Sequence, residues 1–149
     1  DRALLDRFEL VIASIHSNLN MDKDKANDRL IKAIENPSTH ILGHLTGRIL
    51  LGRQGYEINH HKIIDACAAN KVAIEINANP HRLDIDWKYL GYAIEKGVEI
   101  ALSPDAHSLA GIDHIKYGVW MARKGGVPNE MIINNKSTEE FRQWLSLKR

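Results

Sequence analysis

The stretch VEIALSPDAHS, residues 98–108, changes abruptly from apolar to polar. Residues 98–103 have the length and composition of a buried β-strand. A carboxylate, Asp105, and an imidazole, His107, follow at once and are separated by one residue. Ligands of α/β proteins bind outside the carboxyl ends of such strands. The stretch therefore predicts a strand of a parallel sheet with a functional site at its end.

Strand-like and helix-like segments alternate along the rest of the chain. Apolar runs of strand length occupy residues 8–15, 40–44 and 71–80, and residues 131–135 are a candidate fifth strand. The helical segments are residues 21–37, a segment that starts at Asn59, residues 86–97, residues 112–126 and a last segment that starts with the capping box STEE at residues 137–140. This order predicts four or five β-α units with parallel strands, as an open sheet or as part of a (β/α) barrel.

The composition is that of an ordinary globular domain. The chain has 149 residues, 44% of them hydrophobic and 26% charged, which is enough for one domain with its own core. A formal net charge of +1 gives no overall electrostatic argument for nucleic-acid binding. Cys67 is the one cysteine and lies in an apolar helical context, which favours a reduced core thiol. No apolar run is long enough to span a membrane, and we expect a cytoplasmic protein.

Each predicted strand is followed by side chains that can bind metal ions or phosphate. In chain order they are His16, then His44, then Asn77, Asn79 and Arg82, and finally Asp105 with His107. The carboxyl ends of parallel strands open onto one crevice, so these groups should converge. Imidazole and carboxylate together suit Zn²⁺, Mn²⁺ or Fe²⁺. The candidate metal ligands are therefore His16, His44, Asp105 and His107, against the alternative that each is a hydrogen-bonded loop residue.

The other histidines and one buried glutamate are given ordinary roles. His60 and His61 fall in the first turn of a predicted helix and should be solvated, and His114 should lie on a helix surface. His81 lies at the active end of the sheet, and a contact with substrate stays open. Glu75 alternates with apolar neighbours, so it should face away from the helices and join a polar network rather than bind a metal.

Three arginines near the same crevice indicate the class of substrate. Arg48 and Arg53 flank a glycine-rich loop after the second predicted strand, and Arg82 follows the third. Guanidinium groups bind phosphate through paired hydrogen bonds, and glycine lets backbone N–H groups approach it. Beside a metal cluster this favours hydrolysis of a phosphate ester. The candidate substrate-binding residues are Arg48, Arg53, Asn77, Asn79 and Arg82, with Asp105 and His107 as the catalytic pair.

Four motifs, in this order and spacing, resemble the C-terminal half of a PHP (polymerase and histidinol phosphatase) domain. They are ASIHS at 13–17, ILGHLTGR at 41–48, EINANPHRLD at 75–84 and SPDAHS at 103–108. The longer words GHLTGRILLGRQGYEI and AIEINANPHRLDID are similar to the PHP domain of bacterial and archaeal family X DNA polymerases. The resemblance covers nearly the whole chain, so residues 1–149 are expected to be the C-terminal portion of one PHP domain. A small departure is Leu45, where the family usually has proline.

The resemblance implies a distorted seven-stranded, TIM-like (β/α) barrel that holds up to three metal ions, most often Mn²⁺ or Zn²⁺. It implies a metal-dependent 3′–5′ exonuclease and phosphoesterase, with DNA as the partner of the full-length protein and DNA repair as the setting. Carried over by motif, His16 and His44 share one metal, and Asp105 and His107 reach the others. These are the four ligands that the strand pattern also selects.

An absence qualifies this prediction, because the family begins its site with a His-x-His motif and further ligands that are not in the sequence. We therefore expect a piece of a longer protein that is inactive or nearly so by itself. An unpaired strand edge would be available to a second copy, giving a homodimer. Two alternatives stay open: a stand-alone PHP phosphatase of the histidinol-phosphatase type, and a catalytically silent structural PHP module.

Overall fold

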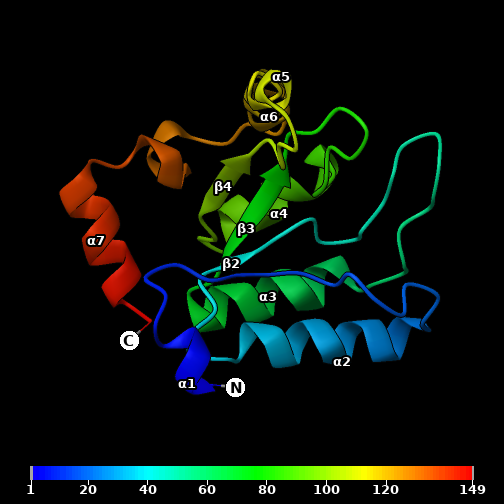
Figure 1. The fold of residues 1–149 in the computed structure, drawn as a ribbon, viewed down its shortest axis with the longest axis horizontal. Coiled ribbons are helices and arrows are strands. Elements are labelled where there is room, and N and C mark those ends of the chain that lie inside the picture. The colour runs from blue at the N-terminus through cyan, green and yellow to red at the C-terminus, as the bar shows by residue number, and fades with distance from the viewer. Residues whose placement is uncertain (1, 149) are drawn as a thin grey trace.

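The computed structural model describes residues 2–148, and in it four parallel strands form one sheet (Figure 1). The strands are β1 (Ile12–Ala13), β2 (Ile41–Leu42), β3 (Ala73–Asn77) and β4 (Ile100–Ser103), hydrogen-bonded to one another in chain order. Parallel neighbours require crossover connections, and here each crossover contains a helix. The predicted α/β class and parallel pairing are confirmed. The described strands form an open sheet, consistent with part of a β/α barrel, and the seven-stranded barrel stays an expectation.

Helices make the crossovers and follow the last strand. α2 (Lys23–Ile34) and α3 (His60–Asn70) pack side by side, and η1 (Trp87–Tyr89) leads directly into α4 (Leu90–Glu95) (Figure 1). After β4 come α5 (Leu109–Ile112), α6 (Ile115–Lys124), η2 (Asn129–Met131), η3 (Ile133–Asn135) and α7 (Thr138–Ser146). A short α1 (Arg2–Leu5), which the sequence analysis did not predict, precedes β1.

Capping side chains fix the helix starts where the sequence predicts them. The side chain of Asn59 accepts a hydrogen bond from the backbone N–H of Lys62 at 3.1 Å, which begins α3. Ser137 and Glu140 form the complete capping box of α7. Each cap satisfies a backbone donor that the helix itself cannot, an effect typically worth about 1 kcal/mol.

The two faces of β3 have different tasks. Ile74 and Ile76 point into the main core, which α2 and α3 close with Leu30, Ile34, Ile63 and Ile64. Ala73, on the opposite face, packs in a second cluster with Trp144 of α7. Glu75 and Asn77 share that opposite face and are both buried. The prediction that Glu75 faces away from the covering helices is therefore confirmed.

Two predicted strands are wrong in extent. Residues 8–15 supply only the two-residue β1, and Phe8 and Leu10 before it remain exposed at 54% and 36%. Residues 131–135 are not a strand, because they belong mainly to the 3₁₀ turns η2 and η3, and their backbone pairs with the sheet at an isolated bridge from Ile132 to Ile100.

A side chain takes the place of the missing fifth strand. The amide of Asn134 accepts a hydrogen bond from Leu102 N–H at 2.8 Å and donates one to Leu102 C=O at 2.9 Å. This pair copies the donor and acceptor of a peptide group, so the outer edge of β4 is satisfied without a strand.

The fold also bears on the expectations for Cys67 and for membrane-spanning segments. Cys67 is buried in α3, and burial raises the pKa of its thiol to about 12, which supports the predicted core role. Within residues 2–148, no helix is long and apolar enough to cross a membrane.

Candidate functional site

Two histidines meet at the carboxyl ends of β1 and β2. The Nε2 atoms of His16 and His44 lie 3.1 Å apart, and the rings meet edge to face with centroids 4.9 Å apart. Two imidazole nitrogens on one tetrahedral ion, each about 2.0–2.1 Å from it, would be separated by about 3.3 Å. This spacing is compatible with one shared metal ion as well as with a hydrogen bond between the rings, and the ligand role of His16 and His44 stays a prediction.

A buried carboxylate holds His44 in place. The backbone N–H of His44 donates to Glu75 Oε2 at 2.5 Å, and Asn77 Nδ2 donates to the same oxygen at 3.4 Å. The hydroxyl of Ser103 donates to the other oxygen. Burial raises the pKa of Glu75, while the bonds from Ser103 and His44 act in the opposite direction. Glu75 is thus the centre of the polar network that its alternation in β3 predicted.

The same network reaches Asp105. Asn77 Nδ2 donates to Asp105 Oδ2 at 3.2 Å, and Arg82 Nε forms an ion pair with that oxygen, also at 3.2 Å. The structure therefore joins the His16–His44 pair to Asp105 and Arg82 through two buried side chains of β3.

His107 is exposed but held at one nitrogen. Its Nδ1 lies 2.8 Å from the carbonyl oxygen of Asp105. A hydrogen bond from Nδ1–H to this carbonyl leaves the Nε2 lone pair free, the arrangement common among metal-binding histidines. His107 therefore has the tautomer and exposure that a ligand needs.

Backbone strain coincides with two of the four candidate ligands. His44 has φ 25° and Asp105 has φ 51°, in the left-handed region that residues with a side chain seldom adopt. Such conformations cost about 1–3 kcal/mol and cluster at functional sites.

The four candidate ligands do not form one closed metal site. Within residues 2–148, no three His, Cys, Asp or Glu side chains lie close enough to hold one ion. The histidine pair and the Asp105–His107 loop are instead two partial donor sets. Catalytic zinc sites use three protein ligands, so the donor chemistry fits a metal but the number present falls short.

The predicted phosphate-binding arginines have different partners in the structure. Arg82 points at Asp105, as described above. The guanidinium of Arg48 instead donates to the carbonyl of Arg82 at 2.8 Å and to that of Leu83, and pairs with Asp86 at 3.0 Å. Arg48 therefore braces the loop after β3, and its predicted contact with phosphate would have to compete with these bonds.

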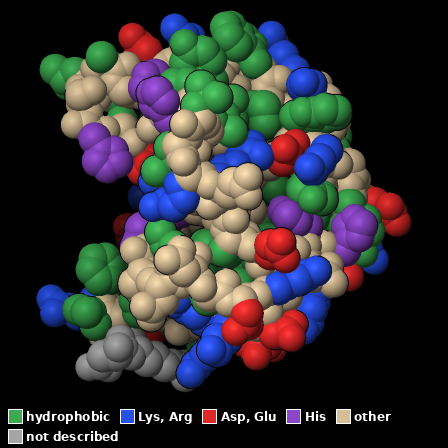
Figure 2. Space-filling view, turned by 90° about the vertical axis from the view of Figure 1, so that its right-hand side faces the viewer, with side chains coloured by type: hydrophobic (Ala, Val, Ile, Leu, Met, Phe, Trp, Pro, Cys, Tyr) green, Lys and Arg blue, Asp and Glu red, His purple; other side chains and the backbone are tan. Residues whose placement is uncertain are grey.

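Arg53 lies apart from that loop. Its Nη2 donates to Gly47 C=O at 2.9 Å, and it lines a groove of about 780 Å³ together with His16 and Lys25. The groove reaches His16, and Lys25 is a second cation there that the sequence analysis did not select. Figure 2 shows acidic and basic side chains intermixed on the face it presents, in keeping with the small net charge.

Asn77, besides its bonds in the crevice, and Asn79 shape the turn after β3. Asn77 Oδ1 accepts from Asn79 N–H at 3.1 Å, and Asn79 Oδ1 accepts from His81 N–H at 3.0 Å. His81 itself is exposed. Successive side-chain to backbone bonds of this kind define an Asx-type turn. Neither bond involves the Asn79 amide nitrogen, which leaves that group available to a ligand.

A buried aspartate was missed by the sequence analysis. Asp84 Oδ2 accepts from both the N–H and the hydroxyl of Thr46, at 2.8 and 2.9 Å, and so ties the loop after β2 to the loop after β3. Burial raises the pKa of Asp84. Threonine next to the GH motif and aspartate at the end of HRLD were visible signals, but only the fold brings them together.

The expectation that His60 is solvated is wrong. Its ring stacks on Tyr89 with centroids 3.7 Å apart, and burial lowers its pKa to about 4. His61 is exposed as expected, whereas the Nδ1 atom of His114 is buried although a surface position was predicted.

Comparison with known proteins supports the resemblance to a family X DNA polymerase. Over 145 residues the chain is 37% identical to the DNA polymerase/3'-5' exonuclease PolX of Bacillus subtilis (strain 168), a match that covers 97% of this chain and 25% of the polymerase. The chain is therefore similar to one part of this polymerase/exonuclease.

Other relatives are named as phosphatases. The chain is 34% identical over 153 residues to a probable phosphatase of Caldicellulosiruptor bescii, covering 96% of this chain and 60% of the relative. It is 27% identical over 155 residues to a probable phosphatase of Caldanaerobacter subterraneus subsp. tengcongensis, covering 98% of this chain and 58% of the relative. No family model matches the sequence. The chain thus spans a quarter of the polymerase and about 60% of the phosphatases.

Proposed function

We propose that this chain carries part of the active site of a metal-dependent phosphoesterase, of the 3′–5′ exonuclease type that works beside a family X DNA polymerase in repair. The observation that supports it most is the His16–His44 pair, with Nε2 atoms 3.1 Å apart, linked through Glu75 and Asn77 to Asp105. Two relatives of different names, a polymerase/exonuclease and a probable phosphatase, support the shared chemistry of phosphate-ester hydrolysis.

One ion, Mn²⁺ or Zn²⁺, would be held by His16 and His44, and further ions would be held by Asp105 and His107. When bound, such an ion lowers the pKa of a coordinated water and polarises a phosphoryl oxygen. Each partial set has too few ligands for tight binding, so we propose weak metal binding by this chain alone and little activity until further ligands complete the site.

The protein groups around the crevice would prepare the donors and the substrate. Glu75 fixes the backbone of His44, and the carbonyl of Asp105 fixes the tautomer of His107. Arg82 orients Asp105 through their ion pair, and it would offer its other guanidinium nitrogens to a phosphate oxygen. Arg53 and Lys25 stand at the groove beside His16, where the next phosphate of a strand would pass.

The substrate separates two versions of this function. A DNA strand with a 3′ end is the proposed substrate, and DNA is the proposed partner of the longer protein. The named alternative is a small phosphate monoester, which the several probable phosphatases among the relatives favour. The alternative of a catalytically silent structural module stays a prediction. The cytoplasmic location is a separate prediction.

Self-association through β1 is also proposed. β1 is an edge strand of the sheet, and Leu4, Phe8 and Ile12 near it are exposed at 52%, 54% and 49%. An edge strand with apolar neighbours is a template for pairing with another chain. Sedimentation of the purified protein should show a homodimer that a charge at Ile12 (Ile12→Lys) converts to monomer, and a wild-type monomer would refute this proposal.

Metal binding is the first test of the proposed site. Equilibrium dialysis against Mn²⁺ and Zn²⁺ should show binding that His16→Ala and His44→Ala abolish and that His61→Ala, an exposed histidine outside the site, leaves unchanged. Equal binding by all of these variants would refute the site.

Hydrolysis is the second test and uses the natural polypeptide that carries this sequence. A labelled single strand should be shortened from its 3′ end in the presence of Mn²⁺, faster than p-nitrophenyl phosphate is cleaved, and His107→Ala should stop it. The reverse preference would favour the phosphatase. Hydrolysis unaffected by His107→Ala would refute the proposed site.

A further inference from the structure

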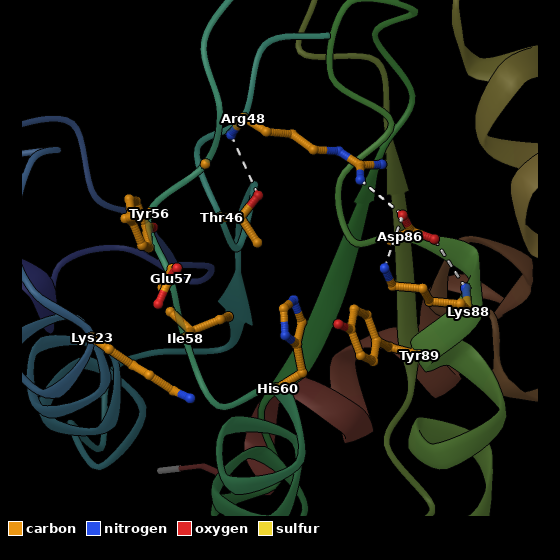
Figure 3. A pocket seen from close by; sticks show the side chains of 11 residues that line it. Lys23, Thr46, Arg48, Tyr56, Glu57, Ile58, His60, Asp86, Lys88 and Tyr89 are labelled. Carbon is orange, nitrogen blue, oxygen red and sulfur yellow. Dashed lines mark hydrogen bonds and ion pairs between the residues drawn. The ribbon is translucent and has the colours of Figure 1, made fainter.

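A second pocket opens beside the loop after β3. It has a volume of about 350 Å³ and is walled by side chains from the loop after β2, the start of α3 and η1 (Figure 3). Arg48 and Thr46 line it, and both also brace the loop that carries Arg82. The pocket is therefore next to the candidate phosphoesterase site but contains none of its proposed metal ligands.

Two stacked rings form one wall of this pocket. His60 and Tyr89 lie nearly parallel, with an angle of 10° and centroids 3.7 Å apart. Figure 3 shows Tyr89 on one side of the His60 ring, with Ile58 and Lys23 on the other. His60 is neutral at physiological pH, because burial lowers its pKa to about 4. The face of the His60 ring turned away from Tyr89 is thus an uncharged aromatic surface, and nucleobases stack on such faces.

The pocket contains amino groups that can bind a phosphate and a carboxylate that can accept a hydrogen bond from a base. Lys23 and Lys88 bring two amino groups, and Arg48 is already paired with Asp86 at 3.0 Å. The contact between Lys88 and Asp86 is long, at 4.0 Å, and Lys88 is 58% exposed, so its amino group can turn to a ligand. Glu57 adds a carboxylate that can accept from the exocyclic amine of a base.

We propose that this pocket binds one nucleotide unit, with its base on the face of the His60 ring turned away from Tyr89 and its phosphate at Lys23 and Lys88. A volume of about 350 Å³ lies in the range of small-ligand pockets. The inference deepens the proposed function, on which it rests, since a nucleotide held here would belong to the strand whose end reaches Asp105 and Arg82. A free nucleotide would satisfy the same chemistry.

The test is a titration followed by amide NMR, with EDTA present so that neither metal nor hydrolysis contributes. 2′-Deoxyadenosine 5′-monophosphate should shift the amides around His60 saturably, and deoxyribose 5-phosphate, which lacks a base, should bind more weakly. His60→Ala should weaken the nucleotide about tenfold, the order found when a stacking residue is removed. His60→Phe, which keeps a flat ring, should restore it.

Two further variants and a tetranucleotide probe distinguish the base site, the phosphate site and the kind of ligand. His61→Ala, the neighbouring histidine, should bind as the wild type does, and Lys23→Gln should weaken both the nucleotide and deoxyribose 5-phosphate. Tighter binding of the tetranucleotide (dA)₄ than of the monomer identifies a strand as the ligand, and equal binding identifies a free nucleotide.

The proposal is overturned if the base adds nothing to binding, if His60→Ala and His61→Ala behave alike, or if no saturable shift occurs. The titration needs no metal, so its outcome is independent of the hydrolysis assay with Mn²⁺. Saturable binding in the titration combined with no hydrolysis in that assay would refute the proposed function and leave the nucleotide pocket standing.

Discussion

The replacement of Glu75 separates hydrogen bonding from charge at the centre of the site. Glu75 Oε2 accepts from His44 N–H at 2.5 Å and from Asn77 at 3.4 Å, and Oε1 accepts from the Ser103 hydroxyl. A glutamine can keep all of these bonds, because its oxygen replaces Oε2 and its NH₂ donates to Ser103, whose hydroxyl rotates to accept. An alanine can keep none of them.

The expected magnitudes follow from that difference. Glu75→Ala leaves the buried N–H of His44 without its acceptor, at about 1–3 kcal/mol, and removes about one further methylene, at about 0.8 kcal/mol. Part of this is offset because a buried carboxylate is itself costly, as its raised pKa indicates. We expect a net loss of about 2 kcal/mol for Glu75→Ala and under about 1 kcal/mol for Glu75→Gln.

Urea unfolding of the two variants and the wild type measures these losses, with the exposed Glu95→Ala as the control for a surface glutamate. Mn²⁺ affinity provides a readout that stability alone does not move. Glu75→Gln should stay within a few-fold of wild type, and Glu75→Ala should bind less, because His44 is no longer fixed. The reasoning is refuted if Glu75→Gln harms stability or Mn²⁺ binding as much as Glu75→Ala, since the charge would then be what the site requires.

Three further predictions concern groups outside that network. Arg48→Lys loses the forked donation to two carbonyls and should lower the free energy of unfolding by about 1–2 kcal/mol; an unchanged urea midpoint would contradict the bracing role. Asn134→Ala frees both backbone groups of Leu102 and should accelerate hydrogen exchange of the Leu102 amide; unaltered exchange would show that the Asn134 amide protects nothing. The pKa of His60 falls to about 4 from 6.5, so stability is complete above pH 6.5 and decreases as the pH falls toward 4, by about 1 kcal/mol once solvent access is allowed for. His60→Phe should flatten this part of the pH profile of the urea midpoint, and identical profiles would contradict it.

Local signals predicted much of the fold. The caps Asn59 and Ser137 act within one turn of chain, so their partners are already present in the sequence. The limits of β1 could not be predicted, because the apolar residues Phe8 and Leu10 stay exposed. Asn134 could not be recognised either, since a side chain that replaces a strand leaves no trace in hydropathy.

The candidate site was predictable to a similar degree. Residues at strand ends converge in any parallel sheet, so His16 and His44 could be brought together from the sequence. The partners of Arg48 could not, because they depend on the path of the loop after β3. The incomplete donor set reflects which residues the chain supplies, and the motif analysis anticipated it.

Asn134 also determines at which edge of the sheet a further strand can pair. An incoming strand at β4 would have to break both amide bonds to Leu102 before it could pair, so this side resists templated extension. β1 is the other edge strand, and its residue Ile12 is half exposed. Additional strands, whether they complete a native barrel or seed an aggregate, are therefore expected to join from the β1 side. The two edges of the sheet therefore differ: the β4 edge is bonded to Asn134, and the β1 edge is the one expected to accept another strand.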